Sequence, residues 1–301
     1  MVAELIGEFM RVSVIIPTYR RERVLINTIR YLLDMNPKAD EIVVVDQTDQ
    51  HADGIEEELR NLEEIGAIRR IRLKYPSIPR AMNEGLNKAR YEIALFLDDD
   101  IRPNPNLLAS HIQMHREYRD VLVAGRVIQP WHTEADFTSR EFHQFCSTAS
   151  SWIDGFMGGN FSLRRKTALS LGGFDENFVR VAYRFESEFA HRYLSSGRKI
   201  LYEPKAAIHH LKEMGGGTRV FSRHLTTSRP DHAVGEYYFL FRTWSDNGGF
   251  VRLVKRPIRA CITRFHARHP WYIPRTLMAE LRGMIWAYRL HLRGARLINK
   301  K

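Results

Sequence analysis

Residues 94–105, ALFLDDDIRPNP, place three consecutive aspartates directly after an apolar run. The run at 94–97 predicts a buried strand, and Pro103 and Pro105 exclude a regular helix just beyond it. Three carboxylates this close repel one another unless a cation lies between them. Carboxylate oxygens are ligands that suit Mg²⁺ and Mn²⁺, and Mg²⁺ usually takes substrate phosphates as further ligands. The stretch therefore predicts a divalent-metal site that holds a diphosphate.

Alternation along the chain distinguishes the three aspartates from one another. In an extended segment every second side chain points the same way. Asp98 and Asp100 therefore share a face, and Asp99 turns aside. We expect Asp100 to ligate the metal and Asp98 to contact the nucleotide or the metal.

The elements on either side of this stretch predict an α/β fold. Apolar runs alternate with segments of helical spacing: strands at 12–16, 41–46 and 68–75, the last at a sheet edge, and helices at 24–33, 54–66 and 79–90. This alternation is typical of a mostly parallel sheet flanked by helices. Ligands of such sheets bind beyond the carboxyl ends of the strands, where Asp46 and the three aspartates fall. A solvated turn is an equally good interpretation of Asp46 alone.

Several other polar residues stay open to two interpretations. In FESEFAHR, Glu186 fits a general base, but the helix dipole also favours acidic residues at a helix start. In PKAAIHHL, His209 and His210 fall on opposite faces of a late strand. Imidazole can ligate Mn²⁺, although a structural role is commoner at such a position. For Arg20 and Arg21, an exposed loop is favoured over phosphate contact.

Composition favours a globular protein of a reducing compartment. The chain has 301 residues, 44% of them hydrophobic, which is enough for a large core. Its two cysteines are too few for a disulfide framework or a zinc site. The first residues, MVAELIGEFMR, match neither a signal peptide nor a transit peptide, and no run of about eighteen apolar residues predicts a membrane span. We therefore expect a cytoplasmic location.

The positive charge of the chain is concentrated near its C-terminal end. The net charge is +11, and residues 251–301 contain thirteen Lys or Arg against one acid, Glu280. The first 250 residues are therefore nearly neutral. The sequence predicts a main domain over 1–230 and a basic helical region over 231–301.

Within that region, apolar residues recur at helical spacing beside a row of arginines. The apolar positions are Leu277, Leu281, Met284, Ile285, Tyr288 and Leu292, and the arginines are Arg282, Arg289, Arg293 and Arg296. This pattern is typical of a helix lying in an anionic membrane interface. Packing of the stripe on the main domain, with solvated arginines, is the alternative. Nucleic acid is disfavoured as a partner because the half with the aspartates is not basic.

The order of these motifs resembles that of the family 2 glycosyltransferases, whose GT-A fold is an α/β nucleotide-binding domain. The resemblance covers roughly residues 11–211. The matching segments are SVIIPTYRR, EIVVVDQTD, RAMNEGLNKARYEIALFLDDDIRP, SLRRKTALSLGGFDENF, FESEFAHRYLSSGRKI and PKAAIHH. Each is weak alone, but their shared order is specific.

The resemblance implies roles for individual residues. Glu186, six residues before Arg192, takes the position of the catalytic base, where the family more often has an aspartate; Gln47 and Met82 also depart from the family pattern. The implied nucleotide-sugar contacts are Pro17, Thr18, Tyr19, Asp46, Asn83, Asp98 and Asp99; the implied metal ligands are Asp100 and His210; the acceptor side is Trp152, Asp154, Gly159 and Asn160. A purely structural role for the acceptor-side set has equal weight.

The implied function is metal-dependent, inverting transfer of a hexosyl or deoxyhexosyl group. Mn²⁺ or Mg²⁺ is the expected cofactor and a nucleotide-diphosphate sugar the expected donor. The expected acceptor is a hydroxyl of a lipid-linked or growing polysaccharide at the inner face of a membrane. Two alternatives stay open: a noncatalytic nucleotide-sugar-binding subunit, favoured by the displaced acidic pair at Phe185–Glu186, and a nucleotidyltransferase, disfavoured because PTYRRERV contains no glycine.

Overall fold

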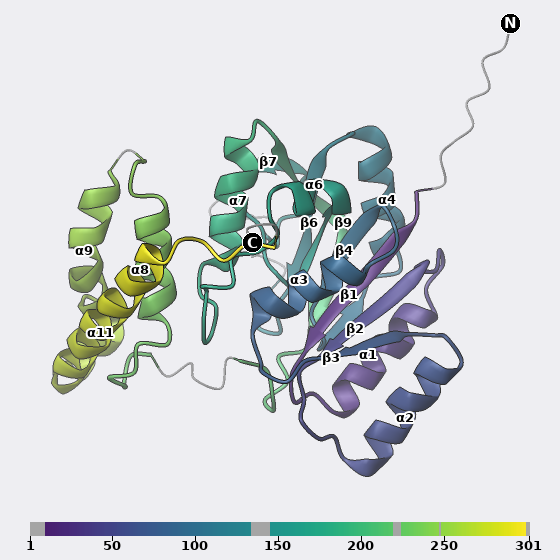
Figure 1. Cartoon of the computed structure of the whole chain (residues 1–301), viewed down its shortest axis with the longest axis horizontal. Helices are drawn as coiled ribbons and strands as arrows, with labels where there is room; N and C mark the ends of the chain where they lie inside the picture. Colours follow the sequence, from purple (N-terminus) through teal and green to yellow (C-terminus); the bar gives the residue numbers. More distant parts are fainter. Residues whose placement is uncertain (1–9, 134–144, 219–223, 247, 299–301) are drawn as a thin grey trace, which may run out of the picture.

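The computed structural model describes residues 10–133, 145–218, 224–246 and 248–298, and shows one large sheet covered by helices on both faces (Figure 1). The strands follow the order β3-β2-β1-β4-β8-β6-β9-β5, and β7 pairs with β9. Their bounds are Val12–Thr18 (β1), Glu41–Asp46 (β2), Arg69–Arg72 (β3), Ile93–Leu97 (β4), Ile101–Pro103 (β5), Val121–Ile128 (β6), Ser151–Ile153 (β7), Asn160–Arg164 (β8) and Lys199–His210 (β9). The N-terminal stretch expected to lack a targeting peptide lies largely outside the described residues.

The helices fall into two groups along the chain. Those around the sheet are Arg23–Leu33 (α1), Asp53–Glu64 (α2), Ile78–Lys88 (α3), Leu107–Glu117 (α4), Arg165–Ser170 (α6) and Phe185–Ser195 (α7). Those that follow the sheet are Ala233–Arg242 (α8), Gly249–Cys261 (α9), Arg264–Arg268 (α10), the 3-10 turn Pro270–Tyr272 (η2) and Ile273–Leu292 (α11). In the described residues no helix is both long and apolar enough to cross a membrane.

The predicted strand–helix alternation of the first hundred residues is confirmed. Strands β1 to β4 pair in parallel, with β3 at the sheet edge as expected. Beyond β4 the sheet is mixed, because β8 is antiparallel to both of its neighbours. Alternate side chains of the central strands enter two apolar cores. Val14 and Val44 face α1, α2 and α4, and Ile15 and Phe96 face α3, α6 and α7. Because both faces are covered, the strands appear in the sequence as continuous apolar runs.

The register brings the carboxyl ends of the strands together. Thr18 at the end of β1 pairs with Asp46 at the end of β2, and β4 lies parallel on the other side of β1. Strand β5, which follows the three aspartates, pairs with the end of β9, where Ile101 is opposite His210. The carboxyl ends of the strands therefore bring together Asp46, the three aspartates at 98–100 and His210.

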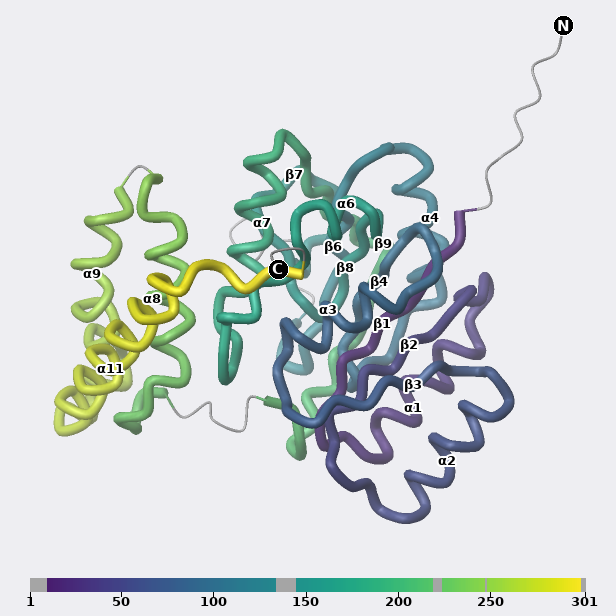
Figure 2. Tube along the Cα trace, viewed as in Figure 1, coloured from purple at the N-terminus to yellow at the C-terminus, as the bar shows by residue number. Residues whose placement is uncertain are grey.

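Helices α8 to α11 form a helical region beside α7 (Figure 1). Helices α8 and α11 approach closely, because a Cβ added to Gly283 would lie 2.5 Å from Cβ of Ala233. The chain after α11 then returns to the sheet domain (Figure 2). There the amide of Arg296 donates to Asp175 Oδ1 at 2.9 Å, and the amide of Ile298 donates to the carbonyl of Gly172 at 2.8 Å. The helical region is thus fastened to the sheet domain beyond its last helix.

Candidate active site

The structure brings Asp98, Asp100 and His210 together at the carboxyl edge of the sheet. One potential ligand atom from each lies within 4.8 Å of the others. His210 Nε2 is 3.1 Å from Asp100 Oδ1 and 3.7 Å from Asp98 Oδ2. The opposite imidazole nitrogen, Nδ1, donates to Gln129 Oε1 at 3.1 Å. With Nδ1–H so engaged, Nε2 is the imidazole nitrogen that faces the two carboxylates. Two carboxylate oxygens and one imidazole nitrogen are a donor set that fits Mn²⁺.

Arg21 is the internal counter-ion of the aspartate cluster. Its Nε lies 3.3 Å from Asp99 Oδ1, and its Nη2 lies 3.3 Å from Asp100 Oδ2. The side chain is only 11% exposed, so the expectation of an exposed loop arginine is wrong for Arg21. Burial raises the pKa of Asp99 to about 7, although Arg21 opposes this shift. Burial also tends to raise the pKa of Asp100, but hydrogen bonds and nearby charges, His210 first, lower it overall.

Arg21 also ties the segment after β9 to the end of β1. Its Nη1 donates to the carbonyl of Glu213 at 2.9 Å and to that of Gly215. The amide of Gly217 donates to the carbonyl of Tyr19 at 2.7 Å. Gly216 has a φ of +74°, and a Cβ there would lie 2.0 Å from the carbonyl oxygen of Arg20. Glycine is therefore required for this segment to cross so close to Tyr19.

The end of β2 carries a closed charge network around Asp46. This carboxylate is fully buried, so the solvated-turn interpretation is wrong. It accepts hydrogen bonds from Arg70 at 2.7 and 2.9 Å, from His51 Nε2 at 3.0 Å and from the Thr48 amide at 2.9 Å. These partners outweigh burial and lower its pKa to about 2. The groups that contact this carboxylate in the structure are Arg70, His51 and the Thr48 amide. Contact of Asp46 with a nucleobase stays a prediction.

Two predicted site residues hold distant backbone segments together. Asn83 Nδ2 donates to the carbonyl of Phe174, and the Phe174 amide donates back to Asn83 Oδ1, both at 2.8 Å. Asn160 is fully buried and donates to the carbonyls of Arg126 and Ala206 at 3.1 and 2.8 Å. In both cases the amide satisfies backbone groups of distant segments, and the predicted nucleotide-sugar and acceptor contacts stay predictions.

Trp152 lies away from the aspartate cluster. Trp152 pairs with Leu201 in β9, far upstream of His210. Leu201 pairs with Val123 of β6, and His209 pairs with Ile128, five residues further along β6. At about 3.3 Å per residue, Leu201 and His209 are therefore about 17 Å apart along the strand direction. The ring packs edge-on against Tyr118, with centroids 5.4 Å apart. The acceptor contacts of Trp152 and Asp154 stay predictions.

Glu186 faces the aspartate cluster across two glycines. A Cβ added to Gly158 would lie 3.0 Å from Glu186 Oε1, and one added to Gly159 would lie 2.2 Å from Asp98 Oδ2. Since neighbouring Cα atoms are about 3.8 Å apart and each Cβ adds about 1.5 Å, the two carboxylates lie within roughly 12 Å of each other. The predicted base and the predicted metal site thus border the same small space.

The other acidic residue of α7 is not available for proton transfer. Glu188 is almost fully buried and accepts hydrogen bonds from Arg192 Nε and Nη2, both at 2.8 Å, and from Arg242 at 3.5 Å. Glu186 is half-buried. Of the two glutamates that begin α7, only Glu186 therefore combines access with proximity to the cluster.

The segment leading into α7 has an unusual backbone. Arg180, Ala182 and Arg184 have φ values of +61°, +51° and +72°, in the left-handed region that L-residues rarely adopt. Helix α8 packs directly on this segment, because a Cβ on Gly235 would lie 2.2 Å from the carbonyl oxygen of Tyr183. Strained residues of this kind cluster at functional sites and are held by surrounding packing. Here the packing comes from the helical region.

Comparison with known proteins adds a sequence relationship. The sequence model of the family described as "Glycosyl transferase family 2" matches residues 13–174, which is more than half of the chain. The chondroitin synthase of Escherichia coli is 27% identical over 228 residues, covering 62% of this chain and 32% of that protein. The glucosyl-dolichyl phosphate glucuronosyltransferase of Haloferax volcanii is 22% identical over 218 residues, covering 67% of this chain and 69% of that protein. The chain thus spans about a third of the first relative and about two thirds of the second.

Solved structures share the fold at low sequence identity. GalNAc-T7 with UDP, GalNAc and Mn²⁺ superposes with a TM-score of 0.63 at 14% identity, over 94% of this chain and 55% of that one. The mannosyltransferase PcManGT of Pyrobaculum calidifontis, with GDP-Man and Mn²⁺, gives 0.55 at 19% identity, over 95% and 80%. S. aureus TarS 1-349 with UDP-GlcNAc gives 0.55 at 15% identity, over 94% and 92%. The predicted GT-A fold is confirmed by these likenesses.

Proposed function

The chain belongs to glycosyl transferase family 2, and from this premise we propose that it is a metal-dependent, inverting glycosyltransferase. Its donor is a nucleotide-diphosphate sugar, and its acceptor is a hydroxyl of a lipid-linked or growing polysaccharide at the inner face of a membrane. Family membership argues against the nucleotidyltransferase alternative, and the turnover of Glu186→Gln distinguishes catalysis from the noncatalytic alternative. The observation that carries the proposal is the placement of Glu186 opposite the Asp98–Asp100–His210 cluster across Gly158 and Gly159.

Asp98, Asp100 and His210 would hold the divalent ion, and Gln129 would fix the imidazole so that Nε2 faces it. The ion, when bound, offsets the charge that develops on the departing diphosphate. Two of the structural relatives contain Mn²⁺ according to their descriptions, which supports this choice of metal class. Asp99 and Arg21 add one acidic and one basic group beside the ligands.

The donor would extend from the metal cluster toward the end of β2. Pro17, Thr18 and Tyr19 lie next to Asp46 across the β1–β2 register and would border the base and ribose. The Asp46–Arg70 pair would present a polar edge for hydrogen bonds to the base. Among the structural relatives, PcManGT holds GDP-Man and TarS holds UDP-GlcNAc, so the test below includes donors of both nucleotides.

Transfer is proposed as a single displacement. Glu186 accepts the proton of the acceptor hydroxyl as that oxygen forms a bond to the anomeric carbon. The bond between the anomeric carbon and the diphosphate oxygen breaks, and the nucleoside diphosphate leaves with the electron pair. Attack from the face opposite the leaving group inverts the anomeric configuration. The acceptor therefore enters from the side of α7, and the donor occupies the side of the aspartates.

Donor binding provides the test. UDP-, dTDP- and GDP-sugars are titrated by calorimetry into the full chain with Mn²⁺ and with EDTA, and into Asp100→Ala and the surface control Asp53→Ala. We expect metal-dependent binding of one donor by the wild type and the control, and loss of this binding in Asp100→Ala. Binding that is unchanged in EDTA and in Asp100→Ala contradicts a metal site at this cluster. Absence of binding by a folded wild-type sample contradicts the proposed donor class.

A further inference from the structure

Helices α9 and α11 present apolar side chains to solvent instead of to the protein core. These are Phe250, Val251, Val254, Ile258 and Ile262 on and just beyond α9, and Leu277, Met278, Leu281, Ile285, Tyr288 and Leu292 on α11. Each is between 44% and 77% exposed. They recur mostly three or four residues apart, so each set forms one face of its helix. A helix of a globular domain normally turns such a face toward the core.

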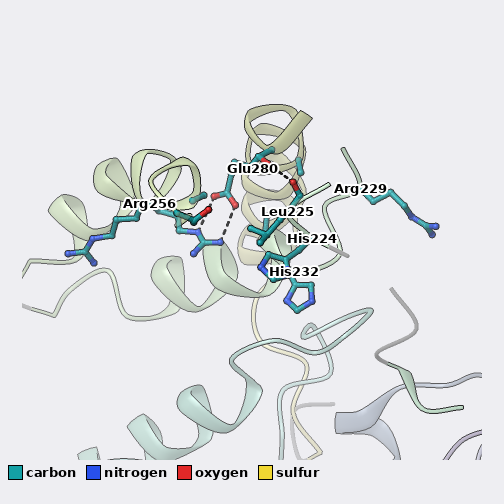
Figure 3. Close-up of a pocket in the computed structure, with 12 residues that line it drawn as sticks. His224, Leu225, Arg229, His232, Arg256 and Glu280 are labelled. Carbon is teal, nitrogen blue, oxygen red and sulfur yellow. Dashed lines mark hydrogen bonds and ion pairs between the residues drawn. The ribbon is translucent and has the colours of Figure 1, made fainter. Parts of the chain in front are cut away.

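The inward face of α11 combines small and polar residues with one buried leucine, Leu290. Helix α11 buries Ala279, Gly283 and Ala287. Between α8, α9 and α11 lies a cavity of about 160 Å³, where Arg256 donates to Glu280 at 3.0 and 3.1 Å (Figure 3). The alternative in which the apolar stripe of α11 packs on the main domain is therefore wrong for all its members except Met284, which packs against the core.

Basic residues accompany the exposed apolar faces in a regular way. Six exposed apolar residues are each followed directly by Lys or Arg: Val251–Arg252, Val254–Lys255, Ile258–Arg259, Leu281–Arg282, Tyr288–Arg289 and Leu292–Arg293. Successive residues of a helix are rotated by about 100°. On each helix this row of basic residues therefore flanks the apolar face, although Arg252 also pairs with Asp246 at 3.9 Å and Arg259 lines the cavity. Residues 251–301 contain one acidic residue, Glu280, and it pairs with Arg256, which is not a member of this row.

We propose that the outward faces of α9 and α11 together form a docking surface for an anionic lipid bilayer. The apolar side chains would enter the boundary between headgroups and acyl chains, and the adjacent Lys and Arg would contact anionic headgroups. A second copy of this chain would bring two strongly positive surfaces together, which disfavours a homodimer at this face. A nucleic acid would pair with the basic row but leave the apolar faces in water.

The docking surface is connected to the candidate catalytic base through α8. Arg184, which precedes α7, donates from Nε to Glu236 Oε2 in α8 at 2.9 Å. Helix α8 packs on α11, and Glu186 lies two residues after Arg184. The helical region that carries the docking surface is thus attached to the segment that precedes Glu186, on the acceptor side of the proposed mechanism. This last step rests on the proposed function and makes the acceptor a molecule held at the bilayer.

The test is co-sedimentation of the full chain with vesicles. One set contains phosphatidylcholine alone, and in the other phosphatidylglycerol replaces roughly a third of it. The variant combines Val254→Ser, Ile258→Ser, Leu281→Ser and Ile285→Ser, which change only exposed positions. The matched control combines Ile65→Ser and Tyr75→Ser, two exposed apolar residues of the sheet domain. Thermal unfolding and the donor titration are recorded for every sample.

We expect the wild type and the control to bind anionic vesicles at least about tenfold more tightly than neutral ones, and binding to weaken with salt. The four-serine variant should lose about tenfold or more in affinity while remaining folded and binding donor. Failure of the wild type to bind anionic vesicles, or equal binding by the variant, overturns the inference. A wild-type dimer that becomes monomeric in the variant also overturns it, since a second copy then covers the face. Donor binding in the same samples tests the proposed function separately.

Discussion

The guanidinium of Arg21 lies 3.3 Å from the carboxylate of Asp100, beside the atoms that would hold a divalent ion. The same side chain contacts Asp99 and the backbone of the segment after β9. Arg21 therefore neutralises part of the aspartate cluster and joins two loops over it. This arrangement makes Arg21 a competitor of the metal for Asp100 and an anchor of the loop at Glu213.

Arg21→Ala is expected to raise the affinity for Mn²⁺ alone by up to about tenfold, because removal of a neighbouring positive charge leaves the carboxylates more attractive to a cation. Donor affinity should fall, since the loop at 213–217 loses its anchor. Mn²⁺ binding is measured by calorimetry and loop opening by limited proteolysis. The control is Arg23→Ala, an exposed arginine paired with Glu58. Weaker Mn²⁺ binding in Arg21→Ala would contradict the role of competitor.

Gln129→Leu tests the orientation of His210. The Gln129 amide accepts the Nδ1–H of the imidazole, and loss of such a partner usually lowers metal affinity by about 10- to 100-fold. We expect a loss in this range for Mn²⁺, with little change in thermal stability. Gln129→Glu keeps an acceptor and should retain binding, and Gln113→Ala provides an exposed control. Unchanged affinity in Gln129→Leu would show that the hydrogen bond does not matter for the metal.

The two glutamates of α7 should separate catalysis from stability. Glu186→Gln is expected to lower kcat by about 10²- to 10⁴-fold, as removal of a general base does, while donor binding and thermal unfolding stay unchanged. Glu188→Ala should instead lower the free energy of unfolding by about 3 kcal/mol, because Arg192 would lose its buried partner. Steady-state kinetics and urea unfolding report the two effects. Full activity in Glu186→Gln would remove it as the base.

Two buried histidines should make stability depend on pH. His111 and His115 are fully buried and connected through the Ser162 hydroxyl, each at 2.8 Å. Burial lowers the pKa of His111 to about 4 and that of His115 to about 3, whereas an unfolded histidine has its ordinary value near 6.5. Between about pH 6.5 and 4 the unfolded chain thus binds more protons, so stability falls as pH falls, by up to about 1.4 kcal/mol per pH unit for each histidine.

The measurement is urea unfolding of the wild type and His115→Leu at pH 7.5 and pH 5. The variant should lose less free energy of unfolding over this interval, because one proton-binding group is gone from the unfolded chain. His209→Gln changes an exposed histidine and should behave like the wild type. An equal loss in wild type and His115→Leu would contradict the assignment.

The sequence was sufficient to predict features that depend on local pattern. The parallel strands, the position of the aspartates at a strand end and the pairing of Asp98 with Asp100 follow from alternation over a few residues. Side-chain partners brought together only by tertiary structure were missed: Gln129 is 81 residues from His210, and Asn83 is 91 residues from Phe174. Helical spacing revealed the apolar stripe of α11 but not whether this stripe faces the protein core or the solvent. That direction depends on the small residues that let α11 approach α8 closely.

The segment that ends at Ile298 has a mechanical consequence for the enzyme. Helix α8 is attached to the segment before α7, and the chain beyond α11 is attached to Gly172 and Asp175. Because the helical region is attached at both ends, it cannot rotate about a single hinge relative to the sheet domain. A bilayer resting on α9 and α11 would therefore meet the sheet domain at a fixed height and tilt. The distance between the lipid surface and Glu186 would then determine how far the acceptor hydroxyl must project above the headgroups to receive a sugar.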